Sequence, residues 1–412
     1  MKLIFLLFGA CFVAACSAET FDGFKVYRLK PFTQDQKNLL ASLENEAESL
    51  DFWNGVNNAG LPVDVMVKPE EQTQFMAKMI QYGIPAEVMI NNVQENINAE
   101  SVSKLGRAGL TWTSYYTLED IYAWLDELAA ENPTVSIISA GQSYEGRDLK
   151  GVKVSFKAGN RGVLIEAGIH AREWIGPATA TYLLNEILTS TDPTFRKIAE
   201  SFDWYIFPSN NPDGFTFTHT TNRMWRKTRT PYGSCIGADP NRNWGSHWGE
   251  NGTSTSACSD TYGGPTVFSE VETSRMSSFI RTIGPSLDVF LSFHSYSQML
   301  LIPYGHSTAP LDNYADVLKI GQAAIASLAT KYGTRYQVGN IAETIYPCSG
   351  TSMDWVKQEF KTPIAYTYEL RDTGANGFIL PANQIIPNCE EVMDSIVTIF
   401  TEGEKLGYFT LG

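Results

Sequence analysis

The fold is decided by residues 163–169, which read VLIEAGI and form an apolar run interrupted only by Glu166. A strand with one solvent face would alternate apolar and polar side chains, so this run predicts a strand buried on both faces. Three further runs share this character: 204–207 (WYIF), 287–293 (LDVFLSF) and 364–368 (IAYTY). Helical patterns separate the four runs. This order predicts an α/β fold with a central sheet covered by helices on both faces.

Three of these runs lead directly into a side chain that is costly to bury. The first is followed by His170, the third by His294 and the fourth by Glu369. Ligands of open α/β sheets bind at the carboxyl ends of the strands, so these side chains mark a candidate site. Glu173 stands three residues after His170, close enough for both to reach one ion if the chain turns after the strand.

The His170–Glu173 pair alone is also typical of a surface turn, but His294 adds a third donor. Two histidines and one glutamate leave the fourth position of Zn²⁺ open for water, as a catalytic zinc site requires. The sequence therefore predicts one catalytic zinc ion held by His170, Glu173 and His294.

Residues 19–107 have the pattern of a small separate α/β unit. A capping box of Thr33 and Gln36 opens one helix, and Pro69 and Gly83 bound a second. Strand patterns surround these helices at 24–29, 50–53, 63–67 and 86–90. The resulting βαββαβ order predicts a two-layer ferredoxin-like domain.

A polar stretch follows at residues 91–111, with scattered Ser, Asn and Gly. We expect it to be an exposed linker. It contains Lys104 and Arg107, so a trypsin-like protease cutting there would release residues 108–412.

The N-terminus has the three-part pattern of a secretory signal peptide: Lys2, an apolar run, and small residues up to Ala18. We expect cleavage after Ala18 and a secreted, extracellular protein. The alternative is a lipid attached to Cys16. No later segment reaches the length of a membrane span. The net charge of −14 disfavours nucleic acid and anionic membranes as partners.

Four cysteines remain once the predicted signal peptide is removed, and an exported chain favours disulfides. Three pairings are possible. The spacing favours Cys235 with Cys258, because these two bracket a stretch rich in Gly, Ser and Thr. A bond between Cys348 and Cys389 stays open.

Five motifs occur in order along the larger part of the chain. They are His170-Ala171-Arg172-Glu173-Trp174, Asn222-Arg223-Met224-Trp225-Arg226, Asp239-Pro240-Asn241-Arg242-Asn243-Trp244, His294-Ser295-Tyr296-Ser297 and Glu369-Leu370-Arg371-Asp372. From about residue 114 to 400 the chain resembles the carboxypeptidase A/B family, and its leading segment resembles that family's activation peptide. The resemblance implies three parts: a signal peptide (1–18), an activation domain (19–107) and a catalytic domain (108–412).

The resemblance implies a mixed central sheet and zinc-dependent removal of C-terminal residues from peptides and proteins. A monomer is the default expectation for the oligomeric state. The enzyme's own propeptide would inhibit it until a trypsin-like protease acts. By similarity, Asp239 accepts a hydrogen bond from His170, although it could be a turn carboxylate. Glu369 resembles the general base, with a salt bridge to Arg371 or Arg172 as the alternative. Arg226 resembles the residue that polarises the scissile carbonyl.

The same resemblance assigns the substrate-binding residues. Asn241 and Arg242 match the pair that binds the terminal carboxylate, and Tyr346 matches a mobile tyrosine that closes over the substrate. Further binding residues are expected to line the path to the zinc: Arg172, Arg223, Tyr296 and Phe378. Surface charge is the alternative for the two arginines, and a plain core position is the alternative for Phe378.

Met353 stands where the family's specificity residue lies. An Asp there selects Lys and Arg, whereas Met cannot pair with a cation, so aliphatic or aromatic termini are expected. Ile341 and Ile345 resemble lining residues of the same pocket. Cys348 and Thr351 are larger than the family's usual residues and would narrow it.

Two other functions remain as alternatives. A zinc amidase acting on small amides would have no need of Asn241, Arg242 and Tyr346. A catalytically silent binding module would have lost a ligand or the base, and none is lost.

Overall fold

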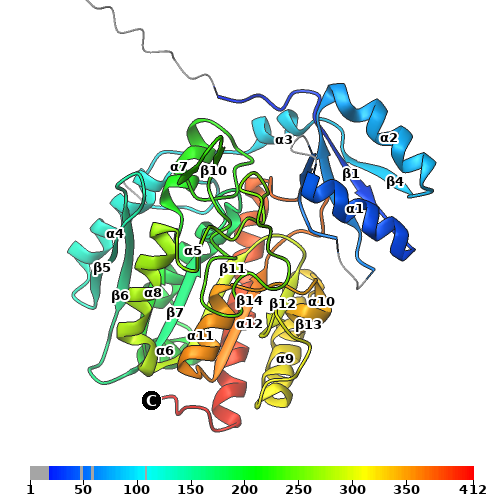
Figure 1. Ribbon diagram of the computed structural model, residues 1–412. Coiled ribbons are helices and arrows are strands. Elements are labelled where there is room, and N and C mark those ends of the chain that lie inside the picture. Colours follow the sequence, from blue (N-terminus) through cyan, green and yellow to red (C-terminus); the bar gives the residue numbers. More distant parts are fainter. Residues whose placement is uncertain (1–17, 47–49, 57–59, 107–108) are drawn as a thin grey trace, which may run out of the picture.

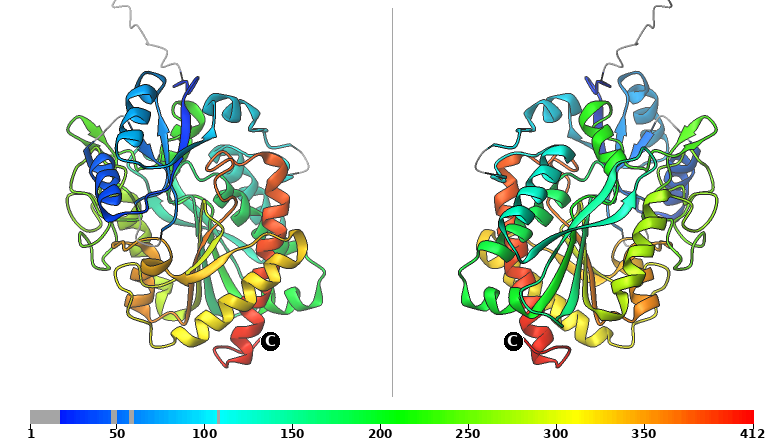
Figure 2. Two further views of the ribbon diagram at one scale, coloured as in Figure 1. Left: turned by 90° about the vertical axis from the view of Figure 1, so that its right-hand side faces the viewer. Right: turned by 90° about the vertical axis from the view of Figure 1, so that its left-hand side faces the viewer.

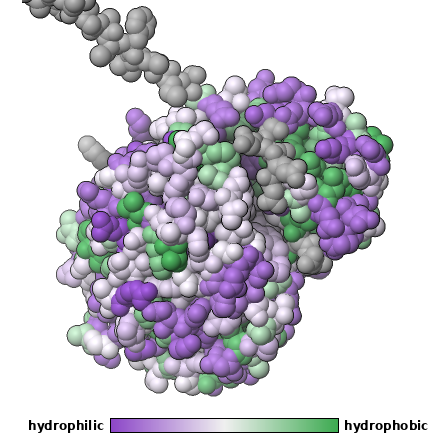
Figure 3. Space-filling model, in the orientation of Figure 1, coloured by the Kyte–Doolittle hydropathy of each residue, from purple (hydrophilic) through white to green (hydrophobic). Residues whose placement is uncertain are grey.

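The computed structural model describes residues 18–46, 50–56, 60–106 and 109–412, which form a large domain and a smaller N-terminal domain (Figure 1). Residues 1–17 of the predicted signal peptide, as well as Arg107, lie outside these ranges. Within them, none of the helices combines the length and apolar character that crossing a membrane requires. The N-terminal domain stands as a lobe against one side of the large domain (Figure 3).

The large domain is built on an eight-stranded mixed sheet in the order β13-β12-β14-β11-β7-β8-β6-β5. The four predicted buried strands are adjacent and parallel at its centre, as β14, β11, β7 and β8. The strands are β5 (Val135–Gln142), β6 (Asp148–Val154), β7 (Arg161–Ala167), β8 (Phe202–Phe207), β11 (Leu287–His294), β12 (Met299–Ile302), β13 (Gln337–Asn340) and β14 (Ile364–Glu369).

Helices cover both faces of this sheet, as predicted (Figure 2). One face packs on α4 (Leu118–Glu131), α5 (Ile175–Thr189), α6 (Pro193–Ser201), α9 (Tyr314–Tyr332) and α12 (Ile385–Lys405). The other packs on α8 (Val271–Ile283) and α11 (Ser352–Phe360). Successive residues of each strand alternate between the two cores, so Val163 and Ile165 of β7 face α5 whereas Leu164 faces the α8 and α11 side. Short helices α7 (Pro212–Thr220) and α10 (Ile341–Thr344) lie at the ends of strands.

The N-terminal domain has the predicted ferredoxin-like topology. Its sheet has the order β2-β3-β1-β4, and two helices pack against one face of it. The capping box forms as expected: the Gln36 amide N–H donates to Thr33 Oγ1, and Thr33 N–H donates to Gln36 Oε1. The elements are β1 (Lys25–Leu29), α1 (Gln34–Glu46), β2 (Leu50–Phe52), β3 (Val63–Val67), α2 (Gln72–Gln81) and β4 (Ala86–Ile90).

The prediction of an exposed linker at residues 91–111 is partly wrong. Residues 93–99 form a short helix, α3 (Val93–Ala99), capped by the Asn92 side chain. Val93 is buried against the N-terminal domain and Glu100 is buried against the large one. These contacts join distant parts of the chain, which local polarity does not reveal. Lys104, in the remaining part, is exposed as expected.

The disulfide between Cys235 and Cys258 is confirmed. It ties the small hairpin of β9 (Pro231–Tyr232) and β10 (Cys235–Ile236) to the Gly/Ser/Thr-rich loop. The open alternative, a bond between Cys348 and Cys389, is wrong. Both are buried free thiols. Cys348 lines a cavity together with the predicted metal donors, and Cys389 contacts Thr179 on the opposite side of the sheet.

Candidate metal centre and substrate cleft

Three buried side chains converge at the carboxyl end of the central strands. His170 Nδ1 lies 2.8 Å from Glu173 Oε1, and His294 Nδ1 lies 3.1 Å from Glu173 Oε2. The two ring nitrogens are themselves 3.2 Å apart. Two imidazole lone pairs and a carboxylate directed at one point fit a divalent cation, which removes their mutual repulsion. The described residues contain no other cluster of this kind.

The local chain path brings these donors together. β7 ends at Ala167, and Gly168, at φ 61°, turns the chain so that His170 stands three residues past the strand rather than directly on it. The turn after His170 then leads into α5. A Cβ on Gly176 would lie 2.9 Å from the carbonyl oxygen of Phe293, so only glycine lets α5 begin this close to β11.

Electrostatics also favour a cation at this point. Burial alone would raise the pKa of Glu173, but His170 and His294 hold it below its usual value. Burial disfavours the charged form of His294, yet Glu173 raises the pKa of that imidazole. Asp239, fully buried, lies 3.1 Å from His170 Nε2 and fixes the ring so that Nδ1 faces the other donors.

Glu369 is the register partner of His294 across β14 and β11. Side chains of paired residues point to the same face of a sheet, so this carboxylate stands beside the three donors. Burial is the main cause that raises the pKa of Glu369 to about 8; His294 opposes the rise and Glu173 adds to it. No side chain among the described residues donates a hydrogen bond to Glu369. A carboxylate of this kind is suited to exchange protons.

Asp239 also organises a cationic wall beside the metal donors. Arg226 Nη2 donates to Asp239 Oδ2 at 2.8 Å, and the Asn241 N–H donates to Asp239 Oδ1 at 2.8 Å. Arg242 donates to the Gly252 carbonyl and, at 3.2 Å, to the Tyr346 hydroxyl. Arg226, Asn241, Arg242 and Tyr346 line one cavity together with the metal donors and Glu369.

That cavity, of about 90 Å³, continues into an apolar end. Met353 is 1% exposed at this end, and its sulfur accepts a hydrogen bond from Thr367 at 3.4 Å. The walls are formed by Leu301, Ile341, Ile345, Cys348 and Thr351. The described carboxylates that line the cavity are Glu173 and Glu369, both at its opposite end.

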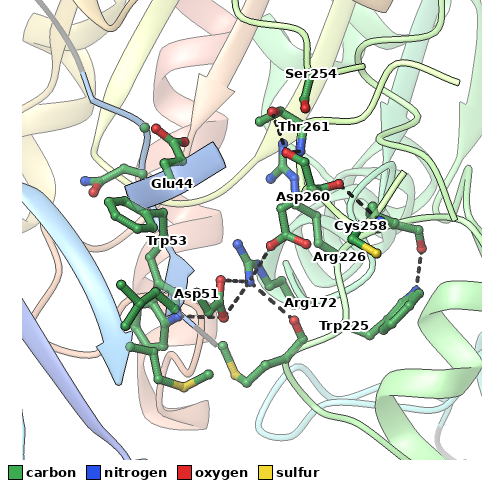
Figure 4. A pocket seen from close by; sticks show the side chains of 18 of the residues that line it. Glu44, Asp51, Trp53, Arg172, Trp225, Arg226, Ser254, Cys258, Asp260 and Thr261 are labelled. Atoms are coloured by element: carbon green, nitrogen blue, oxygen red, sulfur yellow. Dashed lines mark hydrogen bonds and ion pairs between the residues drawn. The ribbon is translucent and has the colours of Figure 1, made fainter. Parts of the chain in front are cut away.

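The N-terminal domain covers the open side of the site. Arg172 donates to both carboxylate oxygens of Asp51 at 3.0 Å, and Asp260 lies 3.8 Å away (Figure 4). Arg223 pairs with Glu100 at 2.7 Å, with both side chains at most 4% exposed. Arg172 and Arg223 are therefore buried under acidic residues of the N-terminal domain, and the alternative that they are surface charges is wrong for the uncut chain.

Apolar contacts lie between these ion pairs. Trp53 packs on Phe378 and Tyr296, with ring centroids 5.2 and 6.2 Å apart. The Tyr296 hydroxyl donates to Asp64 at 2.7 Å, and Asp64 is held by Arg28. Phe378 is thus an interface residue of this cluster rather than plain core.

A second cavity, of about 790 Å³, lies between the two domains next to this contact. It adjoins the smaller cavity, since Trp53, Asn54, Arg226 and Tyr346 line both. The N-terminal domain therefore roofs the approach to the metal donors and leaves the apolar end unfilled.

The structure places the predicted metal donors, Glu369 and most of the predicted substrate-binding residues around one cavity. Arg172 lines the larger cavity instead, and Arg223 lines neither of the two, because it is buried against Glu100. Sequence reasoning missed the residues that meet them from the N-terminal domain: Asp51, Trp53, Asp64 and Glu100. In the sequence each of them is only an acidic or aromatic residue near the end of a strand or helix. Their partners lie more than 100 positions away, so the local sequence does not show that they reach the site.

Known proteins share this arrangement over the whole chain. The family profile described as "Zinc carboxypeptidase" matches residues 121–395, and the profile described as "Carboxypeptidase activation peptide" matches residues 27–100. Zinc carboxypeptidase A 1 of Anopheles gambiae is 45% identical over 411 residues, which cover 98% of this chain and 95% of that protein. Carboxypeptidase A1 of Homo sapiens is 39% identical over 414 residues, covering 97% of each.

Solved structures agree with these matches. The crystal structure of the carboxypeptidase A from Helicoverpa armigera superposes with a TM-score of 0.85 at 29% identity, covering 95% of this chain and all of that one. Two histidines, one glutamate and an adjacent free glutamate, roofed by a ferredoxin-like domain, thus occur here within a fold and sequence shared along the full length. The chain belongs to the zinc carboxypeptidase family and is a metallocarboxypeptidase zymogen with its own activation peptide.

Proposed function

We propose that the protein is a secreted, monomeric A-type carboxypeptidase whose activation domain, residues 19–107, is removed by a trypsin-like protease. The mature enzyme, residues 108–412, would release aliphatic or aromatic C-terminal residues. The observation that carries this proposal is one cavity with metal donors and Glu369 at one end, guanidinium groups along the side and an apolar floor at the other end. The Cys235–Cys258 disulfide supports an exported protein.

The proposed roles follow from this layout. His170, Glu173 and His294 hold zinc, which when bound supplies a Lewis acid and lowers the pKa of a water ligand to about 7. Arg242 and the Asn241 amide bind the terminal carboxylate, for which a planar guanidinium is a strong donor. Tyr346, already hydrogen-bonded to Arg242, closes over the bound terminus.

The remaining residues act at the scissile bond. Arg226 is charged and held by Asp239 beside the donors, and we propose that it donates to the scissile carbonyl oxygen as negative charge develops there. Glu369 takes a proton from the attacking water and passes it to the leaving amine. Upstream residues of the substrate lie along Arg172, Arg223, Tyr296 and Phe378.

The A-type preference rests on Met353. Its thioether is buried on the pocket floor, and burying an unpaired Lys or Arg side chain there would cost several kcal/mol. Cys348 and Thr351 narrow the same pocket, which favours Leu, Ile and Phe over Trp. Peptides that differ only in a C-terminal Leu, Phe, Trp, Lys or Glu test this order after trypsin treatment of the full chain.

In that assay we expect release of Leu and Phe and at least about 100-fold slower release of Lys, because an uncompensated buried charge costs a few kcal/mol. Met353→Asp should reverse the preference by giving the cation a partner, while Met353→Leu should keep it. Failure of the wild-type enzyme to shorten any peptide would contradict the function. Faster release of Lys than Leu would contradict only the specificity.

Latency should depend on the buried ion pair between Glu100 and Arg223. Removing one partner of such a pair costs about 3–5 kcal/mol, because the other charge stays buried and unpaired. We therefore expect Glu100→Gln to raise the activity of the uncut chain and to speed release of the N-terminal domain after the trypsin cut. Peptide hydrolysis before cleavage and size-exclusion chromatography after it measure both effects.

Glu70→Gln is the matched control, since Glu70 is an exposed acid of the same domain. It should behave as wild type in both measurements. Equal latency and equal release for Glu100→Gln and wild type would show that this pair does not hold the N-terminal domain.

A further inference from the structure

Glu166 is a buried carboxylate that the proposed mechanism does not use. It is the last residue but one of β7, is 0% exposed and interrupts the apolar run that decides the fold. Burial raises the pKa of Glu166, while three donors offset part of this effect. A carboxylate kept at such a cost is expected to hold something in place.

The three donors come from three different elements. Ser292 Oγ of β11 donates to Glu166 Oε1 at 2.8 Å, and Asn210 Nδ2, after β8, donates to Oε2 at 2.8 Å. The third donor is the Ser352 hydroxyl at the start of α11, which also bonds to Oε1. Glu166 therefore joins the sheet to the first turn of α11.

The adjacent strands continue this link beneath the specificity pocket. Ser292 is the register partner of both Glu166 and Thr367, so the three side chains form one row on the α11 face. Thr367 contacts Met353, the residue next to Ser352. The row thus fixes the start of α11 at two consecutive residues.

The start of α11 in turn fixes Asn241. The Ser352 backbone N–H donates to Asn241 Oδ1 at 3.0 Å. Because the amide oxygen is engaged on that side, Asn241 Nδ2 is left to face the cavity as a donor. A rotated amide would present its oxygen to the substrate carboxylate and repel it.

We propose that Glu166 is a positioning residue which, through Ser352, sets the amide orientation of Asn241 and thereby the affinity for the terminal carboxylate. This inference rests on the proposed carboxylate-binding role of Asn241. Glu166 does not touch the substrate, so its loss should affect binding of the carboxylate and leave the chemical step largely intact.

The test uses the full chain, cut with trypsin as in the peptide assay. Glu166→Ala should raise KM about tenfold with little change in kcat, since a buried hydrogen-bonded link is worth about 1–3 kcal/mol. The Ki of 3-phenylpropanoate, a simple carboxylate, should rise in proportion. The Asn241→Ala variant should show a raised KM already, and adding Glu166→Ala to it should raise KM no further.

Glu166→Gln is the conservative variant and should restore a KM near that of wild type. Its oxygen can still accept from both serines, and the unpaired Oδ1 of Asn210 can turn to accept from the new amide. If Glu166→Ala does not fold, Ser352→Ala tests the same link, with a smaller rise in KM that again vanishes in the Asn241→Ala background.

Additive effects of Glu166→Ala and Asn241→Ala on KM, or a fall in kcat at unchanged KM and Ki, would overturn the inference. Activity of the wild-type enzyme separates this outcome from failure of the proposed function. An unchanged KM for Asn241→Ala itself would refute the assigned role of Asn241.

Discussion

Replacing Glu369 with Gln is expected to lower kcat by about 10²- to 10⁴-fold, the usual contribution of a positioned general base. Gln keeps the size of the side chain next to His294 but cannot accept the proton. Wild-type activity should rise as the pH rises through the pKa of Glu369 and fall as the carboxylate becomes protonated at lower pH. A bound dication lowers this pKa below the value of about 8 that burial sets, so the rise should lie on the acid side of pH 8.

The remaining activity of the Glu369→Gln variant should not show this fall at low pH, and the variant should still bind zinc. Steady-state kinetics across pH and the zinc content by atomic absorption measure the two effects separately. Glu343→Gln, which changes an exposed carboxylate of α10, is the matched control. It should keep the wild-type kcat and the fall in activity at low pH. A zinc-loaded Glu369→Gln enzyme with near-normal kcat would assign the base to another group.

Removing zinc should abolish hydrolysis altogether. A strong chelator should reduce peptide shortening to background, and added Zn²⁺ should restore it. His294→Ala removes one of three ligands, and we expect it to lose both bound zinc and activity at every pH, because each ligand of a three-residue site is needed to hold the ion. Lower pH should favour zinc loss from the wild type, since protons compete for the ligands.

His247→Ala is the control for this experiment. His247 stacks on His306 in a surface loop away from the metal donors, so its loss should leave zinc content and activity unchanged. Hydrolysis by wild-type enzyme that continues in chelator, with zinc shown to be absent, would contradict the zinc mechanism.

The central strands were predictable because they are buried on both faces. The apolar runs in β7, β8, β11 and β14 reflect that burial directly, and so does the presence of a costly residue where each of three runs ends. The outer strands β5, β6, β12 and β13 were not predicted. β5, β6 and β13 carry polar residues, and β12 is only four residues long. The helix in the predicted linker was missed because the apolar residue it buries, Val93, packs on distant parts of the chain, and the local Asn92 cap alone is also typical of a turn.

The residues of the candidate site were likewise predictable only in part. His170, Glu173 and His294 follow from strand ends and from zinc chemistry, whereas the binding residues came from resemblance to a family. No local pattern reveals that Ser352 faces Asn241, or that Asp51 reaches Arg172 from the other domain. Such contacts depend on register and on domain docking, which the linear order of residues does not encode locally.

The surface that holds the N-terminal domain has a consequence for how this enzyme can evolve. Arg172, Arg223, Tyr296 and Phe378 are engaged by the N-terminal domain before activation, and they are the proposed contacts of the substrate afterwards. A substitution at one of these residues that broadens the range of accepted peptides also weakens binding of the inhibitory N-terminal domain. A new preference for substrate residues upstream of the scissile bond should therefore arise together with compensating changes at Asp51, Trp53, Asp64 or Glu100. The contacting surfaces of the two domains should co-evolve.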